Sequence, residues 1–171
     1  MMSWRAAYWV FVLAALAVYA AMVFWTLPTI AHEAGGLMPF DLRPLGYTEA
    51  EARAFLAALG AEGHAIYSGP QRILDLLYPA LLGISLAGPV LWLVASRPLR
   101  AVFTCVIVAA VASDYLENYF VARLLAGDIS GGAIASASYA TMVKSGLDSI
   151  AFLIVLAVSL HAGVLKWKKR T

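Results

Sequence analysis

The sequence predicts an all-α membrane protein: an antiparallel bundle of four transmembrane helices with a short extracytoplasmic helical cap. Composition is the first observation, because 63% of the 171 residues are hydrophobic and only 13% are charged. That charged fraction is about half of what soluble domains carry. The second observation is a series of four apolar stretches, each long enough to cross the ~30 Å hydrocarbon core as a helix. We therefore expect a single membrane domain over residues 1–171.

The first predicted span covers residues 6–27 and ends before Pro28, because proline interrupts the backbone hydrogen bonds of a helix. Arg5 precedes this stretch, as a basic residue precedes the apolar core of a secretory signal peptide. The apolar run is, however, longer than the about 7–15 residues of such a core. We therefore expect it to be retained as a membrane span.

The other three spans are predicted at residues 72–96, 100–125 and 138–165. Only a short segment separates the second span from the third, which favours an antiparallel helical hairpin. Gly131, Gly132 and the small residues after them predict a flexible loop ahead of the fourth span.

The segment between the first two spans, residues 28–70, is predicted to form the cap. Thr48 and Glu51 have the spacing of a capping box, and Gly60 supplies a stop for the helix that begins there. The apolar stripe of this helix consists of Phe55, Leu56 and Leu59. The residues Ser68–Gln71 predict another N-terminal cap at the start of the second span. These signals indicate an ordered lid.

Positively charged residues concentrate on one side of this layout. They are Arg5, Arg97, Arg100, Lys166, Lys168, Lys169 and Arg170. Because cytoplasmic loops and termini of membrane proteins are enriched in Lys and Arg, both termini and the 96–100 turn are predicted to face the cytoplasm. The cap then lies outside the cytoplasm, and the charge pattern predicts a multi-pass protein of a plasma membrane.

Residue counts exclude several classes of protein. Cys105 is the only cysteine, which excludes an internal disulfide, a CxxC redox pair and a cysteine-based zinc site. The three histidines lie at different predicted depths, so no haem site is expected. The net charge of +2 gives no indication of a nucleic-acid partner. The expected partners are the lipid bilayer, a lipid head group or another membrane protein.

Charged side chains inside the predicted spans are the most informative feature of the sequence. Each costs at least ~2.5 kcal/mol in hydrocarbon, so such residues usually have a partner or a function. At about 1.5 Å per residue, those of the last three spans fall at one level, in or beside the outer leaflet. Asp114, Glu117 and Asn118 also share a helix face, because their spacing is i, i+3 and i+4. The predicted acidic pocket consists of Asp75, Tyr78, Asp114, Glu117, Asn118, Lys144 and Asp148.

Several interpretations of this pocket are open. In a purely structural network, Lys144 would neutralise Asp114 or Asp148, and Arg72 would pair with Asp75. In a binding or accessory protein, the pocket would hold a cation, a lipid head group or a residue of a partner protein. Carboxylates favour Ca²⁺, Mg²⁺ or Mn²⁺, and a histidine from the cap would favour Zn²⁺. The candidate metal ligands are Asp114, Glu117, Asp148 and His64, although no HExxH motif supports them.

The alternative function is a membrane-embedded hydrolase or transferase that acts on a lipid-linked substrate. Glu117 or Asp114 would then act as the general base, directly or through a metal-bound water. The sequence leaves open whether the protein is catalytic and which ligand or substrate it takes.

Two segments resemble known sequences. They are FDLRPLGYT, which follows Met38-Pro39, and DYLEN at residues 114–118. With the layout around them they resemble a group of small, uncharacterised four-span bacterial membrane proteins, over roughly residues 38–120. The resemblance implies the same architecture and a place in a bacterial inner membrane, and it brings no known activity. Asp41 and Arg43, within the first segment, are assigned to a local turn or to a contact with the lid.

Overall fold

The computed structural model describes residues 4–168 of the chain, and within this range every regular element is a helix. The α-helices are α1 (Trp4–Ala21), α2 (Leu27–Glu33), α3 (Glu49–Ala58), α4 (Ala61–Ile66), α5 (Arg72–Leu93), α6 (Arg97–Leu125) and α7 (Gly131–Lys168). A 3-10 turn, Phe40–Leu42, and two π-helical turns, Met22–Thr26 and Tyr67–Gln71, complete the structure. Four continuous helical stretches are long and apolar enough to cross a membrane: Trp4–Glu33, Ala61–Leu93, Arg97–Leu125 and Gly131–Lys168. The predictions of an all-α class and of four candidate spans are confirmed.

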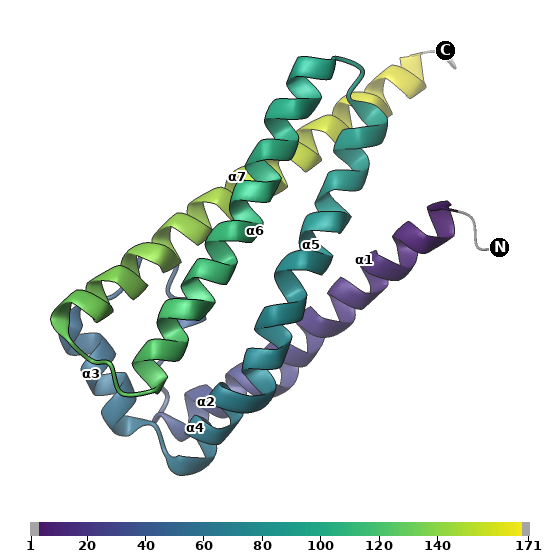
Figure 1. The fold of residues 1–171 in the computed structure, drawn as a ribbon. Coiled ribbons are helices and arrows are strands. Elements are labelled where there is room, and N and C mark those ends of the chain that lie inside the picture. The colour runs from purple at the N-terminus through teal and green to yellow at the C-terminus, as the bar shows by residue number, and fades with distance from the viewer. Residues whose placement is uncertain (1–3, 169–171) are drawn as a thin grey trace.

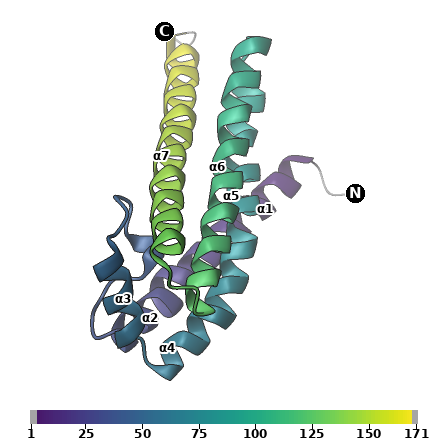
Figure 2. The same cartoon turned by 60° about the vertical axis from the view of Figure 1, so that its left-hand side comes forward.

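The long helices run side by side, and the short ones gather at one end of the molecule (Figure 1). We call this end, which carries α2, α3 and α4, the α3 end. Both ends of the described chain lie at the opposite end, and a second view shows α6 between α5 and α7 (Figure 2). α6 packs against α5 and α7, whereas α1 packs mainly against α5. The three helices α5, α6 and α7 therefore form the centre of the bundle.

The first span is longer than predicted, and the expected end at Leu27 is wrong. The helix continues through Pro28 to Glu33, because Pro28 lies in the first turn of α2, directly after the π-helical turn Met22–Thr26. A π-helical turn shifts the backbone pairing by one residue, and proline is tolerated in the first turn of a helix. Thr26, which ends this turn, is fully buried.

The second span also begins earlier than predicted. The residues Ser68–Gln71 form no cap; they belong to a π-helical turn inside the continuous helix Ala61–Leu93. The two π-helical turns contact each other, and the Thr26 hydroxyl donates a hydrogen bond to the side-chain oxygen of Gln71. The flexible loop predicted at Gly131–Gly132 is wrong as well, because α7 starts at Gly131. Ser130 begins this helix by accepting a hydrogen bond from the Ala133 amide at 3.3 Å.

The predicted helix of the cap is confirmed as α3. The Glu51 amide donates to the Thr48 hydroxyl at 3.2 Å, and the Thr48 amide donates to the Glu51 carboxylate at 2.7 Å. The predicted stripe faces inward: Phe55 is fully buried, and Leu56 and Leu59 pack beside it. Phe55 joins an aromatic core at the α3 end, which also contains Phe40, Tyr47 and Tyr67.

A second, aliphatic core lies further along the bundle, between α5, α6 and α7. Its buried members are Leu86, Val90, Val94, Ile107, Ala110 and Ala151. On each long helix, the ionisable residues of the predicted pocket fall between the residues of the two cores. The two apolar cores therefore bound a polar layer.

Candidate functional site

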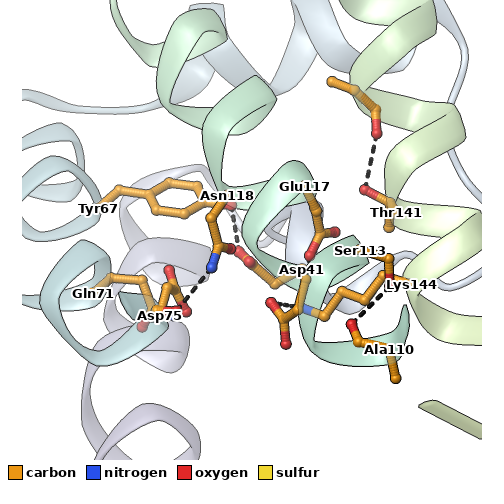
Figure 3. A network of polar contacts seen from close by, with 12 residues as sticks. Asp41, Tyr67, Gln71, Asp75, Ala110, Ser113, Glu117, Asn118, Thr141 and Lys144 are labelled. Atoms are coloured by element: carbon orange, nitrogen blue, oxygen red, sulfur yellow. Dashed lines mark hydrogen bonds and ion pairs between the residues drawn. The ribbon is translucent and has the colours of Figure 1, made fainter. Parts of the chain in front are cut away.

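The polar layer collects side chains from five parts of the chain: the 3-10 turn Phe40–Leu42, the π-helical turn Tyr67–Gln71 and the helices α5, α6 and α7. Its ionisable members are Asp41, Asp75, Asp114, Glu117, Lys144 and Asp148. Figure 3 shows two groups of residues, with Asp41 between them. We describe them as the Lys144 cluster and the Asp75 cluster.

The Lys144 cluster consists of Lys144 and Thr141 on α7 and of Asp114 and Glu117 on α6. The Lys144 ammonium lies 3.1 Å from a carboxylate oxygen of Asp114 and 2.6 Å from one of Glu117. The Glu117 side chain is 0% exposed and that of Asp114 only 5%. Because removing ionised groups from water costs several kcal/mol each, they require a counter-charge at this depth. Lys144 supplies that charge to both carboxylates and ties α6 to α7.

The Thr141 hydroxyl belongs to the same cluster. It donates to the Ala137 carbonyl at 3.2 Å, beside Glu117 and Tyr47. Among the described residues, the Tyr47 hydroxyl and one carboxylate oxygen of Glu117 have no hydrogen-bond partner. Burial raises the pKa of Tyr47, which lies outside the spans, so its hydroxyl stays protonated.

The Asp75 cluster consists of Asp75, Gln71 and Tyr67, together with Asn118 on α6 and Asp41. A carboxylate oxygen of Asp75 accepts a hydrogen bond from the Gln71 amide at 2.7 Å. The Asn118 amide donates to the backbone carbonyl of Asp75 at 2.8 Å, and the Tyr67 hydroxyl donates to Asp41 at 2.5 Å. Within residues 4–168, no Lys, Arg or His lies at ion-pair distance from Asp75 or Asp41. This cluster therefore has hydrogen-bond donors but no cation of its own.

The two clusters form one electrostatic unit. Asp41 interacts electrostatically with Asp75, Asp114, Glu117 and Lys144. Asp148 interacts electrostatically with Lys144 and with Glu117, but in the described chain it forms no ion pair with Lys144. One ammonium thus faces more carboxylates than it can pair with, and Asp75 and Asp41 are among those that have no ion pair in the described chain.

A cleft of about 200 Å³ opens onto the Asp75 cluster between α6 and the helix that runs from α4 into α5. It is lined by His64, Tyr67, Ser68, Arg72, Asp75, Asn118, Val121, Ala122, Leu125 and Ala126. Tyr67 and Asp75 are buried and lie at its floor, whereas His64 and Arg72 are exposed at its mouth. Neither Asp114 nor Glu117 lines this cleft. The Asp75 cluster is thus the part of the polar layer that a ligand can reach.

Not every residue of the predicted pocket belongs to these clusters. Tyr78 stacks on Tyr19 at 5.8 Å between ring centroids and lines a groove between α1 and α5. Asp148 lines a small cavity of about 10 Å³ with Asp114, away from the cleft. The pairing of Arg72 with Asp75 is not found, because Arg72 is exposed and forms no ion pair in the described part of the chain.

The predicted metal ligands are not assembled into one site. Among residues 4–168, no group of three or more His, Cys, Asp or Glu side chains could hold a metal ion. The Lys144 ammonium occupies the position between Asp114 and Glu117 that a cation would take. His64 lies elsewhere, with its ring Nε2 2.9 Å from the Leu125 carbonyl at the mouth of the cleft.

Sequence reasoning missed Asp41 and Tyr67 as parts of the polar layer. Asp41 was assigned to a local turn or a lid contact, but its carboxylate reaches the centre of the layer, beside the buried ring of Phe40 (Figure 3). Tyr67 lies one helical turn before Gln71, so the polar stripe of the second span could have been extended to it. No comparable periodicity pointed to Asp41, because it lies in an irregular segment.

Comparisons of the chain with protein-family models, with curated proteins and with solved structures find no significant match.

Proposed function

We propose that this chain is an integral membrane protein that binds a positively charged group at Asp75, in the acidic part of the polar layer. The observation that carries the proposal is the setting of Asp75. Its side chain is at the floor of a cleft, the residue is only 9% exposed, and Gln71 is the one hydrogen-bond donor to its carboxylate within residues 4–168. A buried carboxylate in this situation is stabilised by an incoming cation.

A second acceptor belongs to another residue that lines the same cleft, Asn118. The side-chain oxygen of Asn118 is buried and has no hydrogen-bond partner in the described structure, because the Asn118 amide nitrogen is the atom that binds α5. Buried polar atoms usually have partners, so an orphaned acceptor in a cleft indicates a ligand that donates. An ammonium group carries both the charge for Asp75 and the hydrogens for Asn118. Such a group belongs to a lipid head group or to a lysine of a partner protein.

The arrangement in the membrane is part of the same proposal. We place the four spans as an antiparallel bundle in a bacterial inner membrane, with the α3 end outside the cytoplasm. The concentration of Lys and Arg at the termini and in the 96–100 turn supports this orientation. Residues 28–70 then form an extracytoplasmic cap, and the cleft lies near the outer membrane surface.

The hydrolase or transferase interpretation gains no support from the geometry. Its candidate general bases, Asp114 and Glu117, are both paired with Lys144 and lie outside the cleft. A general base must come within about 2.6–3.2 Å of the proton that it removes. We therefore propose a binding function and not a catalytic one.

The test measures binding of ethanolamine, as its ammonium ion, to the full-length protein in nanodiscs by ligand-observed NMR. The variant Asp75→Asn should weaken binding by at least about tenfold, which corresponds to about 1.4 kcal/mol. Asp148→Asn is the matched control, because it removes the same charge from the same layer without touching the cleft. Equal binding by the wild type and Asp75→Asn would overturn the proposal.

A further inference from the structure

The cleft carries charges of both signs, at different depths. Asp75 lies at the floor and Arg72 at the mouth, three residues apart on the same helix. Residues at this spacing lie on one helix face, where an Asp and an Arg could pair. They do not, and the Arg72 side chain has no ion pair or hydrogen bond within residues 4–168. The mouth therefore presents an unpaired guanidinium above an unpaired carboxylate.

Resting on the proposed function, we infer that the cleft binds a zwitterionic phosphoethanolamine group, with its ammonium at Asp75 and its phosphate at Arg72. Guanidinium is the side chain best suited to phosphate, because its planar fork of N–H donors matches two phosphate oxygens. The Ser68 hydroxyl, which also lines the mouth, is a further donor within the cleft. Arg72 and Asp75 are three residues apart, a rise of about 4.5 Å along α5, and the two-carbon link of ethanolamine holds the ammonium and the phosphate at a comparable separation.

The size and the walls of the cleft fit a head group and not a whole lipid. Its volume of about 200 Å³ is below the about 300–1,000 Å³ of sites that enclose a drug-sized ligand. The wall formed by α6 is apolar and consists of Val121, Ala122, Leu125 and Ala126. A head group inside the cleft would direct the rest of the lipid along this wall towards the bilayer.

His64 forms part of the mouth of the cleft. Its Nε2 lies 2.9 Å from the Leu125 carbonyl, so the hydrogen is assigned to this nitrogen, and its Nδ1 lies 3.5 Å from the Ser68 hydroxyl. The ring thereby links α4 to α6 across the opening. Arg72 remains the group that distinguishes a phosphate-bearing ligand from a simple amine.

The experiment compares ligands and variants of the full-length protein in nanodiscs. The ligands are dihexanoyl-phosphatidylethanolamine, dihexanoyl-phosphatidylglycerol, the soluble glycerophosphoethanolamine and ethanolamine. The wild type should bind phosphatidylethanolamine at least about tenfold more tightly than either phosphatidylglycerol or ethanolamine. Arg72→Gln should bind phosphatidylethanolamine no more tightly than it binds ethanolamine. Arg72→Lys should retain part of the preference for phosphatidylethanolamine. Arg123→Gln, on the exposed end of α6 and paired with Asp128, is the matched control.

Each outcome separates the two proposals. If Asp75→Asn abolishes ethanolamine binding but Arg72→Gln leaves phosphatidylethanolamine affinity unchanged, the proposed phosphate contact at Arg72 is wrong. The proposed cation site at Asp75 is then still supported. If Asp75→Asn changes neither ligand, the cation site itself is wrong, and the zwitterion with it. Equal affinity for glycerophosphoethanolamine and the lipid identifies a soluble ligand, and preference for the lipid identifies a membrane head group; both outcomes support the site. Arg72 is exposed, so its variants should fold, which matching unfolding temperatures would verify.

Discussion

The Lys144 cluster and the Asp75 cluster lie in the same polar layer and both contain buried carboxylates, yet they differ in two respects. Asp114 and Glu117 share an internal ammonium and lie outside the cleft, whereas Asp75 has no ion-pair partner in the described chain and lies at the floor of the cleft. The first arrangement satisfies buried charge from within the protein. In the proposed function, the second leaves it for a ligand. Access and an internal counter-charge therefore separate a structural acid from a binding acid, although sequence and depth alone make them look alike.

The largest expected effect is on the structural side of this comparison. Lys144→Met leaves Asp114 and Glu117 buried without their ammonium, and breaking a buried pair in this way costs about 3–5 kcal/mol. We expect the unfolding temperature in detergent to fall by on the order of 10 °C. The double variant Lys144→Met with Glu117→Gln should recover part of the loss. An unchanged unfolding temperature in Lys144→Met would contradict the structural role.

Next in size is the contact that holds Asp41 in the layer. Tyr67→Phe removes the hydroxyl that donates to Asp41 at 2.5 Å, and a hydrogen bond to a charged group contributes about 1.5–3 kcal/mol. The segment around Phe40–Leu42 should then open more often, so chymotrypsin should cleave faster after Phe40, which is fully buried in the folded protein. Tyr78→Phe is the control, since Tyr78 faces the groove beside α1. Cleavage rates that match in both variants would argue against the contact.

The capping box provides a reference outside both clusters. Thr48→Ala removes the side-chain cap of α3, which should cost about 1 kcal/mol and increase amide exchange in Glu49–Ala58. Hydrogen bonds from Thr48 lower the pKa of Glu51 below its ordinary value of 4.5. The stabilisation is therefore complete above about pH 4.5 and is lost as the pH falls through the lower, folded-state pKa. Protection factors, which correct for the slower intrinsic exchange in acid, should fall as the pH is lowered; factors that do not fall, or that fall equally in Thr48→Ala, would show that this bond has no such role.

The smallest expected effect on stability is that of Asp75→Asn. Asparagine keeps an acceptor for the Gln71 amide and removes a charge that has no internal ion-pair partner, so the free energy of unfolding should change by less than about 1 kcal/mol. Chemical denaturation in detergent would measure this change. A loss as large as that in Lys144→Met would make Asp75 a structural acid and erase the difference between the two clusters.

The sequence alone predicts much of the fold, because hydropathy and length identify the four spans without tertiary information. The ends of the spans are less predictable. Pro28 and Pro70 both read as helix breaks, but each lies within or beside a π-helical turn, and the two turns are joined by Thr26 and Gln71. That contact joins residues 45 positions apart, so local sequence patterns cannot reveal it.

The polar layer, too, is only partly predictable from the sequence. The spacing of Asp114, Glu117 and Asn118 predicts their shared face, and counting along helices predicts the common depth of Asp75 and Lys144. Which acids Lys144 pairs with depends on how α6 and α7 are rotated against each other, and this is set by packing. The place of Asp41 depends on a loop with no periodicity.

Both polar atoms of the Gln71 side-chain amide form hydrogen bonds. Its oxygen accepts from the Thr26 hydroxyl, and its nitrogen donates to Asp75 at 2.7 Å, while the residue itself is fully buried. Asp75 cannot turn away without breaking a bond that is shielded from water. The acceptor is thus preorganised before any ligand arrives, so little conformational entropy is lost when one docks.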